Sequence, residues 1–484
     1  MENSESFRNY ITKYLIIIIL FYFLCRLLYL ATHISINIPP DEITHFGISK
    51  IFSKTIFLPK DSIESYEFGL ISHVPTLYYC LMGKWLNLNF FDISELIFLR
   101  MGNVIITFIM ALYGLRWIKL VTSNRISILL FMILLTNTPM LSFLGASVSY
   151  DNLTNLFAVT TLFYFHIYFV NHKTSDLLSG YISFLGGTLT KKSFLPLAFI
   201  YFLIFLFHER KRIKEMLVQF KGIFAGNQIK EKFLFVILII FLICNLTLYL
   251  GNLIKFKKII PDRTQIMTEE QAMQNSTYTL YRIVYLYKVG KLTLNEAIQT
   301  ADTIKYDKDR LNALKMLKIA EADKVKKIKI LNRFQYARVW MRSMLKGIIG
   351  IEGHIAMRKT GLLYYSYAII FIVAFINFII FFKNNNNFYL KDAVIISGLY
   401  GIVLMQFVNY PIYEYNLSLS AALQGRYLFP VIVPFYAIMS NYFTDNFKNN
   451  LAIPILICIS VIFIYGDFPF FIENISIFDS IPSR

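Results

Sequence analysis

The chain has 484 residues, 56% of them hydrophobic, and its 48 basic residues outnumber 30 acidic ones to give a formal charge of +18. In a soluble protein that charge would indicate nucleic-acid binding. Here the basic residues gather between long apolar runs, where they set membrane orientation and meet anionic lipid. The composition therefore argues against a soluble enzyme and against a nucleic-acid partner. The cysteines, at 25, 80, 244 and 458, have the spacing of neither a metal site nor a disulfide framework.

Apolar runs of about 18 residues are long enough to cross a bilayer as helices. The first run, 14–32, lacks the small-residue cleavage pattern of a signal peptide and is predicted to stay as a span. We predict an all-α, polytopic membrane protein with about 11 spans. The candidate spans are 14–32, 98–116, 126–144, 153–170, 177–190, 194–208, 233–252, 362–382, 391–409, 427–443 and 449–466. The short pair 177–190 and 194–208 is expected to be tilted or half-sunk.

The orientation of the spans follows from their basic loops. The loop after Phe207 is short and rich in lysine and arginine, which predicts a cytoplasmic location. Counting spans from it places the N-terminus inside and residues 33–97, 253–361 and 410–426 outside. The segment 253–361 is also rich in lysine, but long loops cross the membrane largely regardless of charge. We therefore predict a multi-pass protein of the cell membrane whose site faces the extracytoplasmic side.

Three parts follow from this order: a membrane module at 1–252, a helical extracytoplasmic insertion at 253–361, and membrane helices at 362–484. In the insertion, Thr293 and Glu296 have the spacing of a capping box. Leu311, Leu314 and Leu317 then recur at helical spacing. The stretch 339–357 is apolar but carries several charges, Glu352 and His354 among them, and is predicted to be a surface-lying or re-entrant helix.

The most informative feature is the stretch PPDEITHF at 39–46, directly after the first span. Ionisable residues at a membrane edge are costly and are functional candidates by default. The two prolines end the preceding helix and shape the loop. Asp41 and Glu42 are therefore our candidate catalytic pair, placed just above the bilayer within reach of a lipid headgroup.

Other polar residues fall on the same side by this count, and we predict that they bind substrate. They are His45, His73, Tyr78, Arg100, Asp151, Lys191, Lys192, Gln424, Arg426 and Tyr427. Five of the candidates also have a simpler structural interpretation that stays open here. Asp41 can cap the following helix, Asp151 can belong to a turn with Asn152, the two lysines can anchor at the interface, and Arg426 can mark an aromatic-belt boundary.

Six motifs occur in an order that resembles a known family: PPDEITHF at 39–46, SHVPTLYY at 72–79, LRMGN at 99–103, SVSYDNLTN at 147–155, LTKKS at 189–193 and QGRYLFP at 424–430. The set is similar to a bacterial family of polytopic membrane proteins within the GT-C glycosyltransferase superfamily, and the resemblance covers nearly the whole chain. It departs from the family's pattern at Ile43, where proline is usual, and the paired lysines leave open which one is the family's lysine.

The resemblance implies transfer of a sugar from a polyprenyl-phosphate donor on the extracytoplasmic face, with an acidic residue of the first outer loop as the base. That residue corresponds here to Asp41 or Glu42. A single displacement assisted by one base would invert the anomeric carbon, and a base of this kind contributes roughly 10²–10⁴-fold. Cations would stabilise the leaving phosphate, and Arg426 is the best candidate because a guanidinium binds phosphate through two hydrogen bonds.

The expected partners are a polyprenyl-phosphate-linked sugar, a glycan or lipid acceptor in cell-envelope polysaccharide modification, and membrane lipids. No metal ligand is assigned, but a divalent cation held by Asp41, Glu42, His45 and Asp151 stays open. One alternative is a flippase or transporter of lipid-linked glycans, which would place its charges at mid-membrane on related halves. Another is a polysaccharide polymerase or ligase, against which the Asp-Glu loop argues. The sugar, the donor lipid and the acceptor are not named by the sequence.

Overall fold

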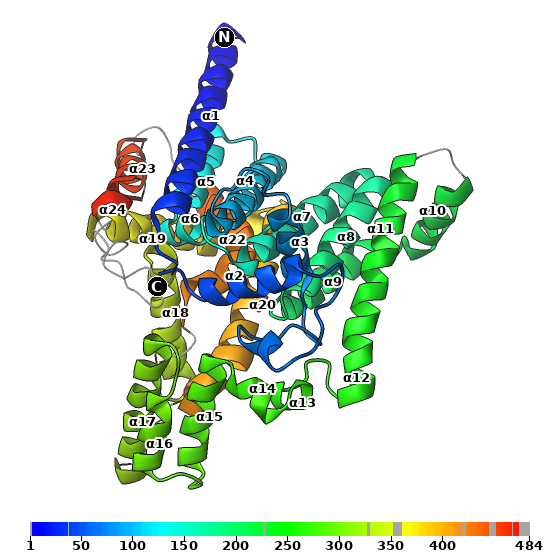
Figure 1. Cartoon of the computed structure of the whole chain (residues 1–484). Helices are drawn as coiled ribbons and strands as arrows, with labels where there is room; N and C mark the ends of the chain where they lie inside the picture. The colour runs from blue at the N-terminus through cyan, green and yellow to red at the C-terminus, as the bar shows by residue number, and fades with distance from the viewer. Residues whose placement is uncertain are drawn as a thin grey trace.

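The computed structural model describes residues 2–36, 38–225, 229–326, 330–351, 361–416, 419, 423–444, 452–466 and 468–473. Within these ranges the chain is helical and contains no strand, in agreement with the predicted all-α class (Figure 1). The first half contains α1 (Glu2–His33), α2 (Glu42–Ser53), η1 (Glu64–Tyr66), α3 (Leu77–Leu86), α4 (Glu95–Val121), α5 (Arg125–Thr136), α6 (Pro139–Gly145), α7 (Tyr150–Asn171), α8 (Thr174–Thr190), α9 (Phe194–Glu209), α10 (Ile213–Ala225), α11 (Ile229–Asn245), η2 (Leu246–Leu250) and α12 (Gly251–Phe256).

The second half begins with shorter helices and returns to long apolar ones. It contains α13 (Arg263–Ile266), α14 (Glu269–Met273), α15 (Ser276–Lys288), α16 (Leu294–Asp302), α17 (Asp307–Lys326), α18 (Arg333–Ile349), α19 (Gly361–Phe381), η3 (Phe382–Asn384), α20 (Phe388–Val403), η4 (Leu404–Asn409), α21 (Tyr410–Asn416), η5 (Gly425–Val431), α22 (Ile432–Thr444), α23 (Ala452–Gly466) and α24 (Phe468–Glu473).

Six helical stretches in the described ranges are long and apolar enough to cross a membrane. They are Tyr10–His33, Glu95–Val121, Tyr150–Asn171, Ile229–Phe256, Gly361–Phe381 and Phe388–Tyr415. A seventh results if the bent pair α5 and α6 counts as one span, and α9 is apolar but shorter. By helix length and composition the chain is therefore a multi-pass membrane protein, while the predicted number of about 11 spans is not confirmed.

The predicted span 126–144 is divided into α5 and α6, which meet at an angle of 58°. Pro139 causes the break, because proline begins a new helix and keeps the preceding Thr138 extended. The buried Arg26 of α1 binds at this break. It donates to the backbone oxygen of Thr136, to Asn137 Oδ1 at 3.0 Å and to the backbone oxygen of Gly466 at 3.1 Å. A cation thus satisfies carbonyl groups that the helix ends leave without partners.

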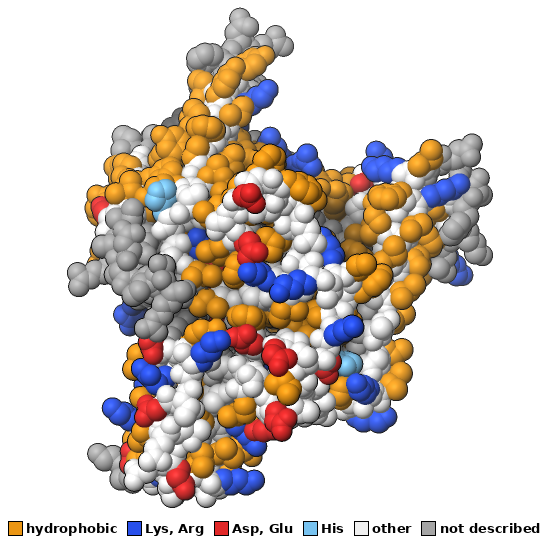
Figure 2. Space-filling view, in the orientation of Figure 1, with side chains coloured by type: hydrophobic (Ala, Val, Ile, Leu, Met, Phe, Trp, Pro, Cys, Tyr) orange, Lys and Arg blue, Asp and Glu red, His pale blue; other side chains and the backbone are white. Residues whose placement is uncertain are grey.

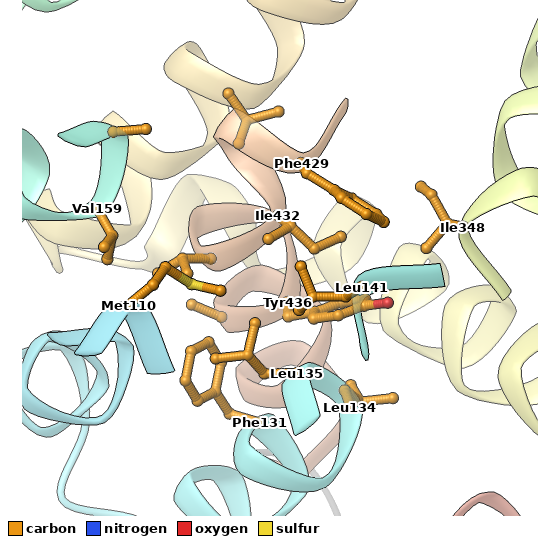
Figure 3. Close-up of a cluster of buried hydrophobic side chains, with 14 of the residues drawn as sticks. Met110, Phe131, Leu134, Leu135, Leu141, Val159, Ile348, Phe429, Ile432 and Tyr436 are labelled. Carbon is orange, nitrogen blue, oxygen red and sulfur yellow. The ribbon is translucent and has the colours of Figure 1, made fainter. Parts of the chain in front are cut away.

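The main core lies where α4, α5, α6, α7, α18 and α22 meet, and Figure 3 shows its centre. Tyr436 of α22 and Leu135 of α5 are fully buried there, and Met110 of α4 lies beside them. Apolar side chains therefore join the two halves of the chain into one bundle. This packing brings η5, which carries Arg426 and Tyr427, next to the start of α7, which carries Asp151.

The segments predicted to share one face do contact each other. Gln271 Nε2 donates to Asp61 Oδ1 at 3.0 Å, and Asn275 Nδ2 donates to the backbone oxygen of Glu67 at 3.1 Å. Lys288 Nζ donates to the backbone oxygen of Tyr415 at 2.6 Å. Residues from 33–97, 253–361 and 410–426 therefore meet at one end of the molecule, opposite the N-terminal end of α1 (Figure 1).

Helices α15, α16 and α17 form a small unit with its own apolar core at that end. The capping box at Thr293 is confirmed, because its hydroxyl accepts from the Glu296 backbone while the Glu296 side chain accepts in return. Figure 2 shows acidic and basic side chains interspersed over α2 and α13–α15, whereas α11 and the upper part of α1 are mostly hydrophobic. The polar end and the apolar bundle are thus separated along the molecule.

Residues 339–357 were predicted to form a surface-lying or re-entrant helix, and α18 contains this stretch as far as Ile349. Its residues Met344 and Ile348 are buried in the main core, and the helix packs against η5 and α6. Arg333, Arg338 and Arg342 of α18 are exposed, while packing partners far along the chain cover its apolar side. Glu352 and His354 lie outside the described residues.

Candidate active site

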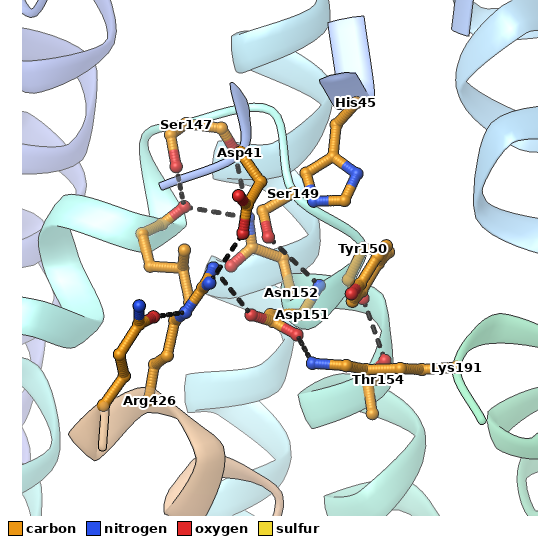
Figure 4. A network of polar contacts seen from close by, with 12 residues as sticks. Asp41, His45, Ser147, Ser149, Tyr150, Asp151, Asn152, Thr154, Lys191 and Arg426 are labelled. Carbon is orange, nitrogen blue, oxygen red and sulfur yellow. Dashed lines mark hydrogen bonds and ion pairs between the residues drawn. The ribbon is translucent and has the colours of Figure 1, made fainter. Parts of the chain in front are cut away.

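Four charged side chains from distant parts of the chain meet at the polar end of the bundle (Figure 4). Arg426 of η5 lies between two carboxylates: its Nη2 is 2.7 Å from Asp41 Oδ2 and its Nη1 is 3.5 Å from Asp151 Oδ2. The second oxygen of Asp151 pairs with the ammonium of Lys191. We call Asp41, Arg426, Asp151 and Lys191 the ion-pair chain. Its two acids and two cations alternate, so its formal charge is zero.

Asp41 is the exposed end of the ion-pair chain. It immediately precedes α2 and adopts a left-handed backbone with φ 61°, a conformation that aspartate tolerates better than most residues. Its side chain makes no capping hydrogen bond, which contradicts the capping interpretation. The side chain is 46% exposed, whereas that of Arg426 is 4% exposed. The turn therefore presents one carboxylate to solvent while a buried guanidinium holds it from behind.

Close backbone packing fixes the position of Arg426. A Cβ atom on Gly425 would lie 2.2 Å from the carbonyl carbon of Gly347 in α18, so only glycine allows this approach. Gln424 Oε1 accepts from Arg426 Nε at 2.6 Å. The ring of Tyr427 lies 5.4 Å from the guanidinium carbon. The QGRY motif thus supplies a close contact, an acceptor, a cation and an aromatic face in consecutive positions.

Asp151 and Lys191 form the buried end of the ion-pair chain. Ser149 caps α7 by accepting from the Asp151 backbone N–H at 3.3 Å, which aims the first turn at the site. Lys191 follows α8, and its ammonium lies 4.6 Å from the ring centre of Tyr150 and 5.5 Å from that of Tyr427. Asp151 is therefore held by two cations inside the site and is not a simple turn residue.

Glu42 and Arg100 form a separate, fully buried pair. Arg100 Nε and Nη2 donate to the two Glu42 oxygens at 2.8 and 2.6 Å, and the Val148 backbone N–H adds a third bond at 2.8 Å. Arg100 Nη1 also donates to the backbone oxygens of Ala31 and Ile34. Neither side chain is open to a ligand in this arrangement. Their pair instead ties the end of α1 to α2, α4 and the loop before α7.

His45 and Tyr78 lie next to the ion-pair chain, inside the protein. His45 Nδ1 is 2.8 Å from the hydroxyl of Tyr79, and its ring meets that of Tyr150 edge to face. Burial lowers the pKa of His45 to about 4, although the carboxylates of Asp41 and Asp151 act in the opposite direction. The ring is therefore neutral near pH 7.

Tyr78 belongs to a buried hydrogen-bond network that sequence reasoning missed. Its hydroxyl donates to Asn103 Oδ1 at 3.0 Å, and Asn152 Nδ2 donates to the same oxygen at 3.0 Å. Asn152 also donates to the backbone oxygens of Leu144 and Ser147. The network holds the loop that leads to Asp151. The motifs SVSYDN and LRMGN contain the two asparagines, but nothing in either motif shows that the asparagines share a partner.

The last two predicted residues lie at different distances from this site. His73 contacts Asn252, with Nδ1 3.1 Å from Oδ1, and Phe256, so its described contacts connect the first outer loop to α12 and not to the ion-pair chain. Lys192 is exposed beside Lys191. The structure thus distinguishes the paired lysines, since only Lys191 bonds to Asp151.

The proposed cation ligands do not form a metal site here. Glu42 is occupied by Arg100 and Val148, and Asp151 by Lys191 and Arg426. In the described part of the chain, no three His, Cys, Asp or Glu side chains gather in a ligand arrangement.

No family model and no curated protein matches the chain. Among solved structures it is similar to ArnT from Cupriavidus metallidurans. The apo structure of that protein has a TM-score of 0.38 and 10% identity, with 88% of this chain and 76% of that chain covered. The structure bound to undecaprenyl phosphate has a TM-score of 0.35 and 11% identity, with 89% and 76% covered. At these values the likeness establishes neither the fold nor the activity of this chain.

The arrangement brings together Asp41, Asp151, Lys191, Gln424, Arg426 and Tyr427 of the predicted residues. Tyr150, which the sequence analysis did not single out, lies between His45 and Lys191. Chemically, the site offers one exposed carboxylate to a ligand, and cations and aromatic faces behind it. A proton acceptor beside anion-stabilising groups fits the transfer of a group from a phosphate to a hydroxyl.

Proposed function

We propose that this chain is a membrane glycosyltransferase of the GT-C type. It transfers a sugar from a polyprenyl-phosphate donor to a glycan or lipid acceptor on the extracytoplasmic face, in cell-envelope polysaccharide modification. The observation that carries the proposal is the ion-pair chain itself. A half-exposed carboxylate stands at a strained turn beside two cations, and the four charges come from four separate segments. The Asp41 carboxylate is the only one of the four charges that is largely open to solvent, and it is therefore the one that a substrate can reach.

The reaction is a single displacement. The acceptor oxygen forms a bond to the anomeric carbon, and its proton passes to the Asp41 carboxylate. The bond between the anomeric carbon and the phosphate oxygen breaks, and polyprenyl phosphate leaves with the electron pair. One displacement inverts the anomeric carbon. A positioned carboxylate base contributes roughly 10²–10⁴-fold to such a step.

Arg426 couples donor binding to the freeing of the base. Without a ligand its Nη2 is bound to Asp41, while Nη1 faces Asp151. A donor phosphate competes with Asp41 for the guanidinium, because phosphate accepts two hydrogen bonds from its planar fork. Once Arg426 turns to the phosphate, Asp41 is free to accept the acceptor's proton. Lys191 keeps Asp151 paired meanwhile, so no buried carboxylate is left without a partner.

Glu42 is a positioning residue in this mechanism. Its oxygens are held by Arg100 and by the Val148 backbone, which keeps Asp41 at the start of α2 facing η5. Asp41 is therefore the base in our proposal, and Arg100 does not bind phosphate.

The test uses the purified protein in lipid nanodiscs with a polyprenyl-phosphate donor that carries a labelled sugar. We expect the label to move to an acceptor and NMR of the product to show an inverted anomeric carbon. The donor is to be identified first from the glycans that disappear in a deletion strain. A protein that moves lipid-linked glycans across a vesicle membrane but leaves every sugar-phosphate bond intact would refute the proposal in favour of a flippase.

The face of the membrane is tested separately. Single cysteines placed in 33–97 and in 253–361, in a variant without the native cysteines, should react with an impermeant thiol reagent in intact cells. A cysteine in the basic loop after α9 should react only after lysis. The opposite pattern would place the site on the cytoplasmic side.

A further inference from the structure

Two cations near the ion-pair chain have no described partner. Lys192 is exposed directly after Lys191, and Arg263 is exposed as the first residue of α13. Within the described ranges, neither side chain has an ion pair or hydrogen bond. The carboxylate nearest to Arg263 along the chain, that of Asp262, is occupied by Lys258. Most other basic residues of the site are paired, so these two cations form an exception.

Apolar packing connects α13 to the helices around the site. Met267, directly after α13, is buried in the same apolar cluster as Tyr79 and Val148, and Ile266 and Tyr150 pack against that cluster. Tyr150 in turn lies under the Lys191 ammonium. Arg263 is one helical turn before Met267, so the segment 253–361 contributes a cation to the edge of a site otherwise built by the membrane helices.

Electrostatics indicate that Lys192 and Arg263 lie close together. The pKa of Lys192 is lowered, mainly because the protein removes its ammonium from bulk water and to a lesser extent because Arg263 and Lys191 are positively charged. The surrounding protein likewise lowers the pKa of Arg263. Both residues are exposed as a whole, yet the protein crowds the surroundings of their charged groups. Holding like charges together in such surroundings is unfavourable, and an anion bound between them would remove the repulsion.

The charge of the ion-pair chain shows why such cations are needed. The chain is already neutral, with Arg426 and Lys191 both bound to carboxylates. A phosphate that entered it alone would leave the site with a net negative charge. Lys192 and Arg263 carry two further positive charges to its edge.

We infer that Lys192 and Arg263 form a phosphate-binding subsite at the entrance of the ion-pair chain. Arg263 supplies a planar two-donor fork and Lys192 a mobile point charge. The phosphate contacts these cations first and then reaches Arg426. The source of the phosphate, a polyprenyl phosphate or a bulk lipid headgroup, is the part that rests on the proposed function.

The experiment measures the binding of three probes to the full-length protein. They are undecaprenyl phosphate in phosphatidylcholine nanodiscs, phosphatidylglycerol in the same nanodiscs, and inorganic pyrophosphate in detergent. The dissociation constant is obtained from the rise of melting temperature with ligand concentration. The variants are Lys192→Gln, Arg263→Gln, the double variant and Arg263→Lys. Lys291→Gln, an exposed lysine between α15 and α16, is the matched control.

We expect each single variant to weaken undecaprenyl phosphate binding about tenfold and the double variant by about a hundredfold, with Arg263→Lys in between. Melting without ligand should be unchanged, because both side chains are exposed. A loss of phosphatidylglycerol binding in place of undecaprenyl phosphate binding would support the subsite with a bulk lipid as its ligand. Equal affinity of the double variant and the wild type for all three probes would overturn it. An equal loss of affinity in the control variant Lys291→Gln would also overturn the subsite.

Transfer assays on the same preparations separate the two proposals. If the double variant loses phosphate binding while the wild type transfers no sugar, the subsite stands and the glycosyltransferase proposal falls. If the wild type transfers sugar and the double variant keeps wild-type affinity, the enzyme stands and the subsite falls.

Discussion

Asp41 and Glu42 are adjacent carboxylates, and their different surroundings predict opposite results for the same chemical change. Asp41→Asn removes a proton acceptor that is 46% exposed and paired with one cation. A partly exposed ion pair contributes about 1 kcal/mol or less to folding. Glu42→Gln removes a charge from a fully buried pair and leaves Arg100 without a counter-ion. Breaking a buried pair in this way costs about 3–5 kcal/mol.

The effects on activity should be the reverse of the effects on stability, with Asp41→Asn the more damaging of the two changes. Asp41→Asn should melt within a few degrees of the wild type but transfer sugar roughly 10²–10⁴-fold more slowly, which corresponds to about 3–5 kcal/mol in the activation barrier. Glu42→Gln should melt much lower, and its remaining folded fraction should keep measurable turnover. The folded fraction of each variant is measured by size-exclusion chromatography before the assay.

Two controls separate catalysis from positioning. Asp41→Asn should still bind undecaprenyl phosphate, because the cations are unchanged and Arg426 has lost a competitor. The double variant Glu42→Gln, Arg100→Gln should recover part of the stability lost in Glu42→Gln, because no buried charge remains. An Asp41→Asn protein with normal turnover, next to a Glu42→Gln protein that melts normally but is inactive, would refute the assignment and make Glu42 the base.

Three further predictions concern the residues around this pair. Arg426→Ala should weaken donor binding by roughly one to two orders of magnitude. Arg426→Lys should weaken it by less, because the lysine keeps the positive charge but lacks the planar fork. Normal donor binding by Arg426→Ala in titrations would exclude a role of Arg426 in binding the phosphate. Gly425→Ala should reduce both the activity and the melting temperature, because its methyl group would lie 2.2 Å from the backbone of Gly347. The control Gly398→Ala in α20, which has open space around it, should change neither quantity. His45 has a pKa of about 4 in the folded protein, against 6.5 for an unburied group. Its contribution of about 3 kcal/mol to stability is therefore complete above pH 6.5 and is lost as the pH falls towards 4. Melting temperatures measured against pH should show this loss in the wild type and a smaller loss in His45→Asn, and the same pH dependence in both proteins would contradict the argument.

Local signals in the sequence predicted much of the architecture. The apolar runs that begin near Glu95 and Gly361 became single long helices, and the capping box at Thr293 formed as expected. These features depend on residues a few positions apart, so they are readable without the fold. The number of spans was less accessible, because hydropathy does not show that Pro139 bends one run into two helices.

The sequence by itself also determined which residues are unusual enough to be candidates: the carboxylates after Pro40, the paired lysines and the arginine of the QGRY motif. Their roles remain predictions. Only the tertiary structure decided which of them meet. Glu42 binds Arg100 inside the protein, and Arg426 joins Asp41 across 385 positions of chain. The physical reason is that an ion pair depends on which helices pack together and on how deeply each charge is buried, and no local pattern contains that information.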